Sequence, residues 1–213
     1  IAAFSQADWI IEAVFEELRV KQDVFARVEA VAKPEAIFAT NTSSLSVDEI
    51  GAKLKHPERL VGFHFFNPVA VMPLIEVVKA KKTSDEALAT AMATAAKLKK
   101  TAVITSDSPG FVVNRLLAKL LGEAMHAVDE GTSFDVVNHA LDPFGLPMTA
   151  FELLDLVGLK VGAHVLDTHH AAFPDRFFES KNLHKLNPLA RWTWGDVWHY
   201  IAEHQVDYNP LHD

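Results

Sequence analysis

The chain has 213 residues and a formal net charge of −8; 49% of its residues are hydrophobic and 23% are charged. This composition is ordinary for a globular protein, and the length allows one large domain or two small ones. The negative charge argues against nucleic acid and anionic membrane surfaces as partners, because both bind a basic protein face. The absence of cysteine excludes disulfides, thiolate nucleophiles and Cys-based metal sites, and it is compatible with a reducing compartment. A cytoplasmic location is expected, with mitochondrial and peroxisomal locations as the alternatives.

No apolar run approaches the length of a membrane span, and no signal segment of charged and then apolar residues opens the chain. Membrane attachment is therefore not expected. The first residue is Ile rather than Met, and residues 7–14 already have the apolar pattern of a buried strand. We expect the sequence to be the middle of a longer protein.

Strand and helix patterns alternate in the first half of the chain. Apolar residues at helical spacing from Leu18 to Val31 predict a helix that Pro34 closes. Capping-box sequences at 46–49 and 83–86 predict a short helix toward residue 54 and a second helix over residues 87–100. Strand patterns occupy residues 36–40, 60–66, 74–78 and 101–105. This alternation predicts an α/β layer in which much of the sheet is parallel.

The pattern becomes helical after about residue 107. Ser108 and Pro109 are typical of a helix start, and apolar positions from Val112 to Val128 predict one long helix that ends at Gly131. No strand pattern of similar quality follows. The sequence therefore predicts an α/β part over residues 1–107 and an all-helical part over residues 108–213.

Two further helix starts are predicted in the helical part. Ser133 is expected to cap one helix, and a third capping box at 149–152 is expected to begin a helix over residues 153–165. From about residue 181 the chain is rich in tryptophan, tyrosine and histidine. No repeat or motif explains this tail.

Polar side chains interrupt the strand patterns near their ends. Residues 41–44 close one strand pattern, His64 and Asn67 close another, and Glu76 lies in a third. Ligands bind at the carboxyl ends of strands in open α/β sheets, so His64 and Glu76 are candidates for a base and its orienting carboxylate. A histidine beside aromatic residues is nevertheless more often a packed residue, and residues 41–44 alone read as a turn before a helix.

Other candidates are weaker. Asn114 lies among apolar residues of the long helix and either faces the junction between the two parts or is an exposed neighbour of Arg115. The lysine runs at 79–82 and 97–100 are typical of solvated surface. Histidines spaced five apart, at 164 and 169 and at 199 and 204, do not share a helix face, so no metal site is expected. No Gly-x-Gly occurs, so these residues contain no phosphate-binding glycine loop.

Four motifs occur in order: Asn-Thr-Ser-Ser-Leu at 41–45, Gly-Phe-His-Phe-Phe-Asn-Pro-Val at 62–69, Ile-Glu-Val-Val at 75–78 and Ser-Pro-Gly-Phe-Val-Val-Asn-Arg at 108–115. Together they resemble the L-3-hydroxyacyl-CoA dehydrogenase family, which includes 3-hydroxybutyryl-CoA dehydrogenases and the dehydrogenase part of fatty-acid oxidation proteins. The resemblance covers about residues 7–180. It implies the C-terminal half of a Rossmann-like NAD-binding domain, followed by a helical dimerisation and substrate domain.

The resemblance also implies an activity, which is the NAD-dependent interconversion of L-3-hydroxyacyl-CoA and 3-oxoacyl-CoA. His64 would be the general acid or base on the substrate hydroxyl, and Glu76 would orient it. Ser43 and Asn114 would bind the reacting oxygen. The residues implied to line the nicotinamide half of the NAD site are Glu16, Lys21, Ser43 and Asn67.

Two departures from the family pattern limit these expectations. The first Rossmann half, with its glycine fingerprint, should precede Ile1, and the tail lacks the basic, glycine-rich segment of many members. The partners implied are an acyl-CoA substrate of unspecified chain length and a second copy of the chain, bound through the helical domain. The alternative is an inactive fragment that serves as a dimerisation or assembly module, which has no need of a His64–Glu76 pair.

Overall fold

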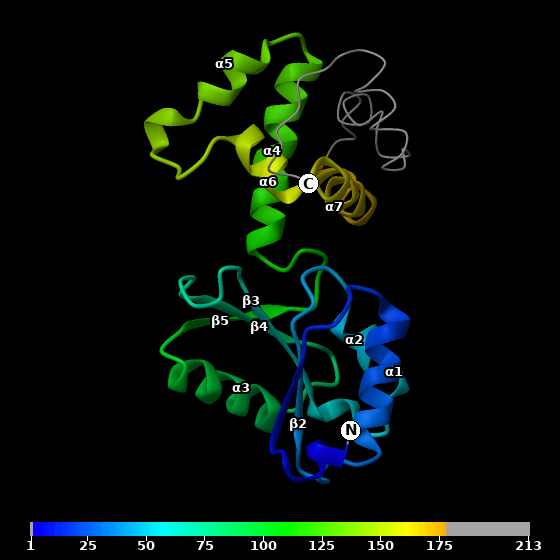
Figure 1. Ribbon diagram of the computed structural model, residues 1–213. Helices are drawn as coiled ribbons and strands as arrows, with labels where there is room; N and C mark the ends of the chain where they lie inside the picture. The colour runs from blue at the N-terminus through cyan, green and yellow to red at the C-terminus, as the bar shows by residue number, and fades with distance from the viewer. Residues whose placement is uncertain (1, 178–213) are drawn as a thin grey trace, which may run out of the picture. The chain divides into compact units, whose positions relative to one another are not determined.

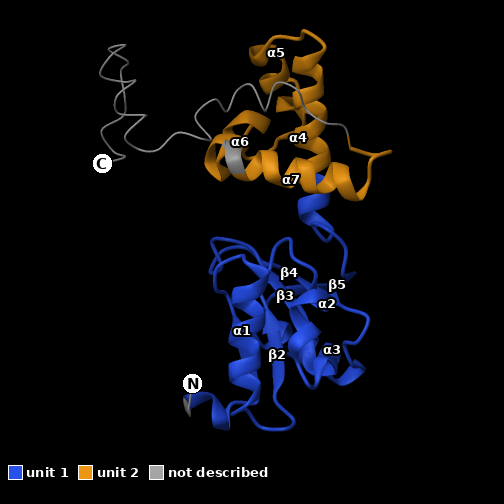
Figure 2. Ribbon diagram, turned by 90° about the vertical axis from the view of Figure 1, so that its right-hand side faces the viewer, with its two compact units in different colours: residues 1–116 blue, residues 117–213 orange. Residues whose placement is uncertain are grey.

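The computed structural model describes residues 2–177, which belong to two compact units, residues 1–116 and residues 117–213 (Figure 2). The first unit holds a five-stranded sheet with helices on both faces. The described part of the second unit contains helices and no strand. The predicted order of an α/β part followed by a helical part is confirmed.

The strands of the sheet follow one another in space in the same order as in the chain. They are β1 (Trp9–Glu12), β2 (Ile37–Thr40), β3 (Leu60–Phe65), β4 (Leu74–Lys79) and β5 (Thr101–Ser106). All neighbouring pairs are parallel except β3 and β4, which are antiparallel. In that antiparallel pair His64 lies opposite Glu76. The two candidate residues are therefore cross-strand neighbours, close enough for their side chains to meet.

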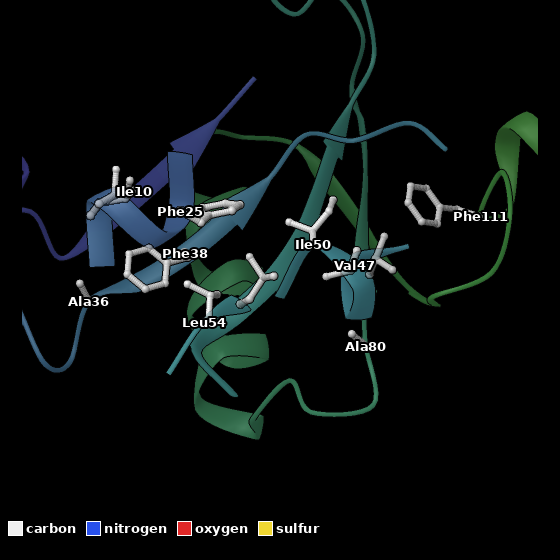
Figure 3. Packing of buried hydrophobic residues seen from close by; sticks show 12 residues of the cluster. Ile10, Phe25, Ala36, Phe38, Val47, Ile50, Leu54, Ala80 and Phe111 are labelled. Carbon is white, nitrogen blue, oxygen red and sulfur yellow. The ribbon is translucent and has the colours of Figure 1, made fainter. Parts of the chain in front are cut away.

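Helices cover both faces of this sheet (Figure 1). On one face, α1 (Leu18–Glu29) and α2 (Val47–Ile50) pack Phe25 and Ile50 into a core with Phe38 of β2 (Figure 3). On the other face, α3 (Asp85–Lys97) presents alanines four residues apart, at 87, 91 and 95, to the sheet. Alanine at this spacing gives one smooth helix face that lies close to the strands. Short 3₁₀ turns occupy Ala2–Gln6, Gly51–Lys53, Pro57–Arg59 and Asp142–Phe144.

The first unit differs from the sequence predictions in three places. Strand β1 is an edge strand and Ile11 is 41% exposed, so the prediction of a buried strand is wrong there. Helix α1 ends at Glu29, before Pro34. Helix α3 is capped by Ser84, while Thr83 donates to the carbonyl of Leu60 and accepts from the amide of Ala80. Thr83 therefore belongs to the preceding turn.

The described helices of the second unit follow from α4 (Val113–Asp129), which begins within the first unit. They are α5 (Phe134–His139), α6 (Ala150–Val157) and α7 (Leu159–Ala172). Their shared core includes Met125, Leu154 and Leu166. Among residues 2–177, no helix is long and apolar enough to cross a membrane.

Helix boundaries in this region confirm some predictions and correct others. The cap at Ser133 and the capping box between Thr149 and Glu152 are both present. The start predicted at Ser108 is wrong, because Gly110 and Phe111 have left-handed φ angles of 67° and 47° and delay the helix to Val113. The single helix predicted over residues 153–165 is divided at Gly158. The aromatic tail from about residue 181 lies outside the described residues.

Candidate active site

His64 and Glu76 form a buried pair on the sheet. His64 Nδ1 lies 2.8 Å from Glu76 Oε2, and the residues are 5% and 1% exposed. The strand register holds both backbones, so the pair is fixed by the sheet rather than by a loop. With Nδ1 donating to the carboxylate, Nε2 is the ring nitrogen left to accept a proton from a ligand.

The other oxygen of Glu76 is bound by the chain that leads into α4. Oε1 accepts the backbone N–H groups of Val112 and Val113, both at 2.9 Å. Burial works to raise the pKa of the Glu76 carboxyl, but the hydrogen bonds from His64 and from these two amides hold the pKa below its usual value. An ionised Glu76 can both orient the imidazole and stabilise its charged form.

Two aromatic rings confine the imidazole. The ring centre of Phe66 lies 4.5 Å from that of His64, and the ring centre of Phe111 lies 5.6 Å away. Phe111 is 1% exposed, and its left-handed backbone directs the following two amides toward Glu76. The turn at Gly110 and Phe111 therefore supplies both a wall for His64 and donors for its partner.

The loop after β2 and the start of α4 meet beside this pair. Asn114 Nδ2 donates to the backbone carbonyl of Ser43 at 3.3 Å. Asn41 Oδ1 accepts the N–H of Phe65 at 3.0 Å, which ties the same loop to the end of β3. Asn114 is thus partly buried and held by a specific polar contact, and its role toward a reacting oxygen stays a prediction.

Glu16 and Lys21 belong to a polar cluster at the end of β1. Glu16 Oε1 accepts from the hydroxyl of Thr42 at 2.5 Å and from the amide of Ser43 at 2.8 Å. Glu16 Oε2 lies 3.2 Å from Lys21 Nζ. Lys21 is 1% exposed and also binds Glu12, at 3.0 and 3.1 Å. Glu16 is therefore the member of the cluster that is most accessible, with a side chain 36% exposed.

These groups border one open cleft of about 380 Å³ within the first unit. The predicted site residues on its walls are Glu16, Lys21, Ser43, His64, Asn67 and Asn114. Glu76 lies behind His64, and the rest of the lining comes from Ala13, Val14, Asn41, Phe65 and Phe66. Carboxylate, amide, hydroxyl and imidazole groups thus face a cavity that also has apolar walls.

Sequence reasoning missed Glu12 and Thr40. Glu12 ends β1, and Thr40 lies opposite it in the register and donates its hydroxyl to the Glu12 carboxylate. The available signal was an acidic residue in an apolar strand pattern, followed nine residues later by a lysine within a helix. A buried carboxylate is normally paired, so such a residue predicts a partner even when it does not identify one.

Comparisons with known proteins agree with this architecture. The family model described as the NAD binding domain of 3-hydroxyacyl-CoA dehydrogenase matches residues 1–108. The model for the C-terminal domain of 3-hydroxyacyl-CoA dehydrogenase matches residues 110–193.

Among curated proteins, the chain is similar to the fatty acid oxidation complex subunit alpha of Vibrio vulnificus, with 45% identity over 175 residues. The match covers 82% of this chain and 25% of the relative. The subunit alpha of Pseudomonas putida is 42% identical over 178 residues, which are 84% of this chain and 25% of that relative. The chain therefore spans about a quarter of the length of these curated relatives.

The chain covers a larger share of two similar proteins with solved structures. The structure of M. tuberculosis FadB2 is 35% identical with a TM-score of 0.81, and the match covers 87% of this chain and 67% of that one. The 3-hydroxybutyryl-CoA dehydrogenase of Escherichia coli K12 is 38% identical with a TM-score of 0.82, over 87% of this chain and 40% of that one.

Proposed function

Since the chain belongs to the 3-hydroxyacyl-CoA dehydrogenase family, we propose that the protein interconverts L-3-hydroxyacyl-CoA and 3-oxoacyl-CoA with NAD. The observation that carries this proposal is the buried His64–Glu76 pair, whose free imidazole nitrogen borders the cleft. A base held by a carboxylate beside a cleft suits proton removal from a secondary alcohol.

In the oxidative direction, His64 Nε2 takes the proton of the substrate 3-hydroxyl. Glu76 keeps Nδ1–H directed at its carboxylate and stabilises the imidazolium that results. Ser43 and Asn114 bind the substrate oxygen as it becomes a carbonyl, and their mutual contact keeps both groups at one place on the wall. In the reductive direction the same imidazolium returns the proton to the oxygen.

The cleft residues fit the nicotinamide half of NAD. Glu16, Ser43 and Asn67 offer acceptors and donors for ribose hydroxyls and a carboxamide, and Ala13 and Val14 offer an apolar wall for a ring. When bound, NAD supplies the acceptor for the hydride that leaves C3. No Gly-x-Gly occurs in the 213 residues, so these residues contain no glycine-rich loop for the pyrophosphate of NAD.

The alternative, a dimerisation or assembly module without activity, gives no reason for a histidine to be buried against a carboxylate at a polar cleft. Burying two ionisable groups costs free energy that an interface module would not need to spend. The dehydrogenase activity therefore explains more of the first unit.

We further propose a homodimer that forms through the helical unit. Its support is a set of large apolar side chains that are more than half exposed, namely Val136, Phe144, Leu156 and Val161. Sedimentation of the purified protein checks the dimer.

We also propose a cytoplasmic location, supported by the lack of cysteine, and a domain division near residue 107.

The test is reduction of acetoacetyl-CoA by NADH, followed at 340 nm, with the protein in its natural length. We expect turnover in the unmodified protein and a decrease of about a thousandfold in His64→Gln, because general acid–base groups contribute roughly 10²- to 10⁴-fold. Circular dichroism should show that the variant is folded.

The matched control is His56→Gln. His56 also pairs with a glutamate, with Nδ1 3.0 Å from Glu58, but this pair is on the surface of the same unit and does not border the cleft. Its removal should leave turnover within about twofold of the unmodified protein. Normal turnover in His64→Gln would contradict the assigned role, and an inactive unmodified protein would favour the assembly module.

A further inference from the structure

Glu12 is a buried carboxylate at the end of β1 that no role in the proposed reaction explains. It is 5% exposed, and its oxygens accept from Lys21 Nζ, from the hydroxyl of Thr40 and from the N–H of Val14 at 3.1 Å. A carboxylate with this many donors is held in one position. Glu12 is thus a fixed negative charge adjacent to the cleft residues Ala13 and Val14.

Lys21 joins this charge to the cleft wall. Its ammonium contacts Glu12, the carbonyl of Val14 at 3.4 Å, and Glu16 Oε2 at 3.2 Å. These partners use the three N–H donors of an ammonium, and the side chain is 1% exposed. Lys21 therefore acts on a ligand mainly through Glu16, whose carboxylate it holds in place.

Glu16 in turn organises the loop that follows β2. It accepts from the hydroxyl of Thr42 and from the amides of Ser43 and Ser44, at 2.5, 2.8 and 3.1 Å. Burial works to raise the pKa of Glu16, but these hydrogen bonds and the Lys21 ammonium hold the pKa below its usual value. The cluster is continuous from Glu12 to Ser43, and Ser43 accepts the Asn114 amide.

The two glutamates Glu12 and Glu16 and the one lysine, Lys21, give the cluster a formal net charge of −1. We propose that Glu12 is a positioning residue that fixes Glu16 through Lys21, and that this net charge favours the oxidised form of a bound nicotinamide. The inference rests on the proposed function, because it requires NAD to occupy the cleft.

The preference follows from charge alone. The oxidised nicotinamide ring carries one positive charge that the reduced ring lacks, so a negative wall lowers the free energy of the oxidised form only. A fivefold change in a binding ratio corresponds to about 1 kcal/mol, which one unit charge near the ring can supply at an effective dielectric constant of about 20. By the same factor, the charge shifts the equilibrium of hydride transfer between bound species toward NAD⁺ and the hydroxyacyl substrate.

The experiment measures the dissociation constants of NAD⁺ and NADH by isothermal titration calorimetry. Glu12→Gln keeps the shape of the side chain, removes one negative charge and brings the cluster to neutrality. We expect NAD⁺ to bind about tenfold more weakly and NADH about twofold more weakly, so that their ratio changes by about fivefold. A variant that binds both forms as the unmodified protein does would overturn the inference.

A second variant separates charge from positioning. Glu12→Gln combined with Lys21→Met restores a net charge of −1 but removes the link that holds Glu16. We expect weaker binding of both forms, with the ratio returned to within about twofold of the unmodified protein. This double variant also covers the case in which Glu12→Gln does not fold, since it buries no unpaired ammonium. Unchanged affinity of the double variant for both forms would overturn the positioning role.

The matched control is Glu29→Gln. Glu29 pairs with a buried cation, Arg59, and accepts two backbone amides, but neither residue borders the cleft. Glu29→Gln should lower the melting temperature of the protein and leave the ratio of the NAD⁺ and NADH dissociation constants unchanged. A Glu29→Gln ratio that moves as much as that of Glu12→Gln would overturn the inference, because loss of any buried pair would then suffice. Failure of the unmodified protein to bind either form would instead overturn the proposed function itself.

Discussion

Near each end of strand β3, a buried side chain is paired with a glutamate. Just before its first residue, Arg59 lies 3.3 Å from Glu29, and near its last residue His64 lies 2.8 Å from Glu76. Each glutamate also accepts two consecutive backbone amides at 2.9 Å, from residues 55 and 56 or from residues 112 and 113. The two pairs therefore have the same arrangement, in which one buried carboxylate binds both a side chain and two consecutive backbone amides.

The partner of each glutamate differs in chemistry. Arg59 is permanently charged, donates to the carbonyls of Lys33 and Pro34, and lies 5.0 Å above the ring of Phe38. His64 carries an imidazole, a group that can act as an acid or a base, and one of its ring nitrogens is left for the cleft. We therefore expect that an acid–base partner at a cleft, rather than burial alone, separates a reactive pair from a stabilising one.

The largest expected effect comes from neutralising each glutamate in turn. Glu76→Gln should lower turnover by about a thousandfold, because the amide can no longer stabilise an imidazolium and can favour the wrong tautomer. Glu29→Gln should leave turnover within about twofold. Steady-state kinetics with acetoacetyl-CoA measure both. If the two variants lose equal turnover, the distinction between the pairs fails.

The next prediction concerns stability and replaces the partner of each glutamate instead of the glutamate itself. Arg59→Met removes the cation and keeps most of the apolar stem, leaving Glu29 buried without its partner. We expect a loss of about 3 kcal/mol in the free energy of unfolding, since breaking a buried ion pair costs roughly that much. His64→Gln should cost less than half of this, because the glutamine amide can still donate a hydrogen bond to the Glu76 carboxylate. Urea unfolding measures both values, and a greater loss in His64→Gln would contradict the contrast.

Much of the fold could be predicted from sequence because its signals are local. Alternating strand and helix patterns predicted the α/β order, and the capping box at Thr149 has the expected partner in Glu152. The helix start at Ser108 was predicted wrongly, because two residues with positive φ follow it and sequence pattern favours glycine, not phenylalanine, in that conformation. The cost of the left-handed Phe111 is offset by contacts that lie far away in the chain.

The motifs predicted the candidate site and the meeting of His64 with Glu76, but the other contacts within the site were not predicted. Twelve residues separate His64 from Glu76, and their opposition follows from an antiparallel pair within a sheet that the pattern predicts to be largely parallel. The contacts of Glu12 were not predicted, because an acidic residue in an apolar strand pattern does not by itself indicate that it is buried or that Lys21 is its partner. The roles of the seven site residues and the division near residue 107 stay predictions.

The smallest expected effect is on stability. The difference in the free energy of unfolding between the unmodified protein and Glu76→Gln should depend on pH. The folded protein holds the pKa of Glu76 below the value of 4.5 that it has when unfolded. Ionised Glu76 therefore adds stability that is fully present above pH 4.5 and is lost as pH falls through the folded pKa. At pH 7 the free energy of unfolding of the unmodified protein should exceed that of Glu76→Gln by on the order of 1 kcal/mol, the usual net contribution of a hydrogen bond. This difference should become smaller below pH 4.5. Other carboxyls titrate alike in both proteins, so the difference between their urea unfolding curves isolates Glu76. A difference that stays constant from pH 7 to pH 3 would mean that Glu76 is not the ionised partner of His64.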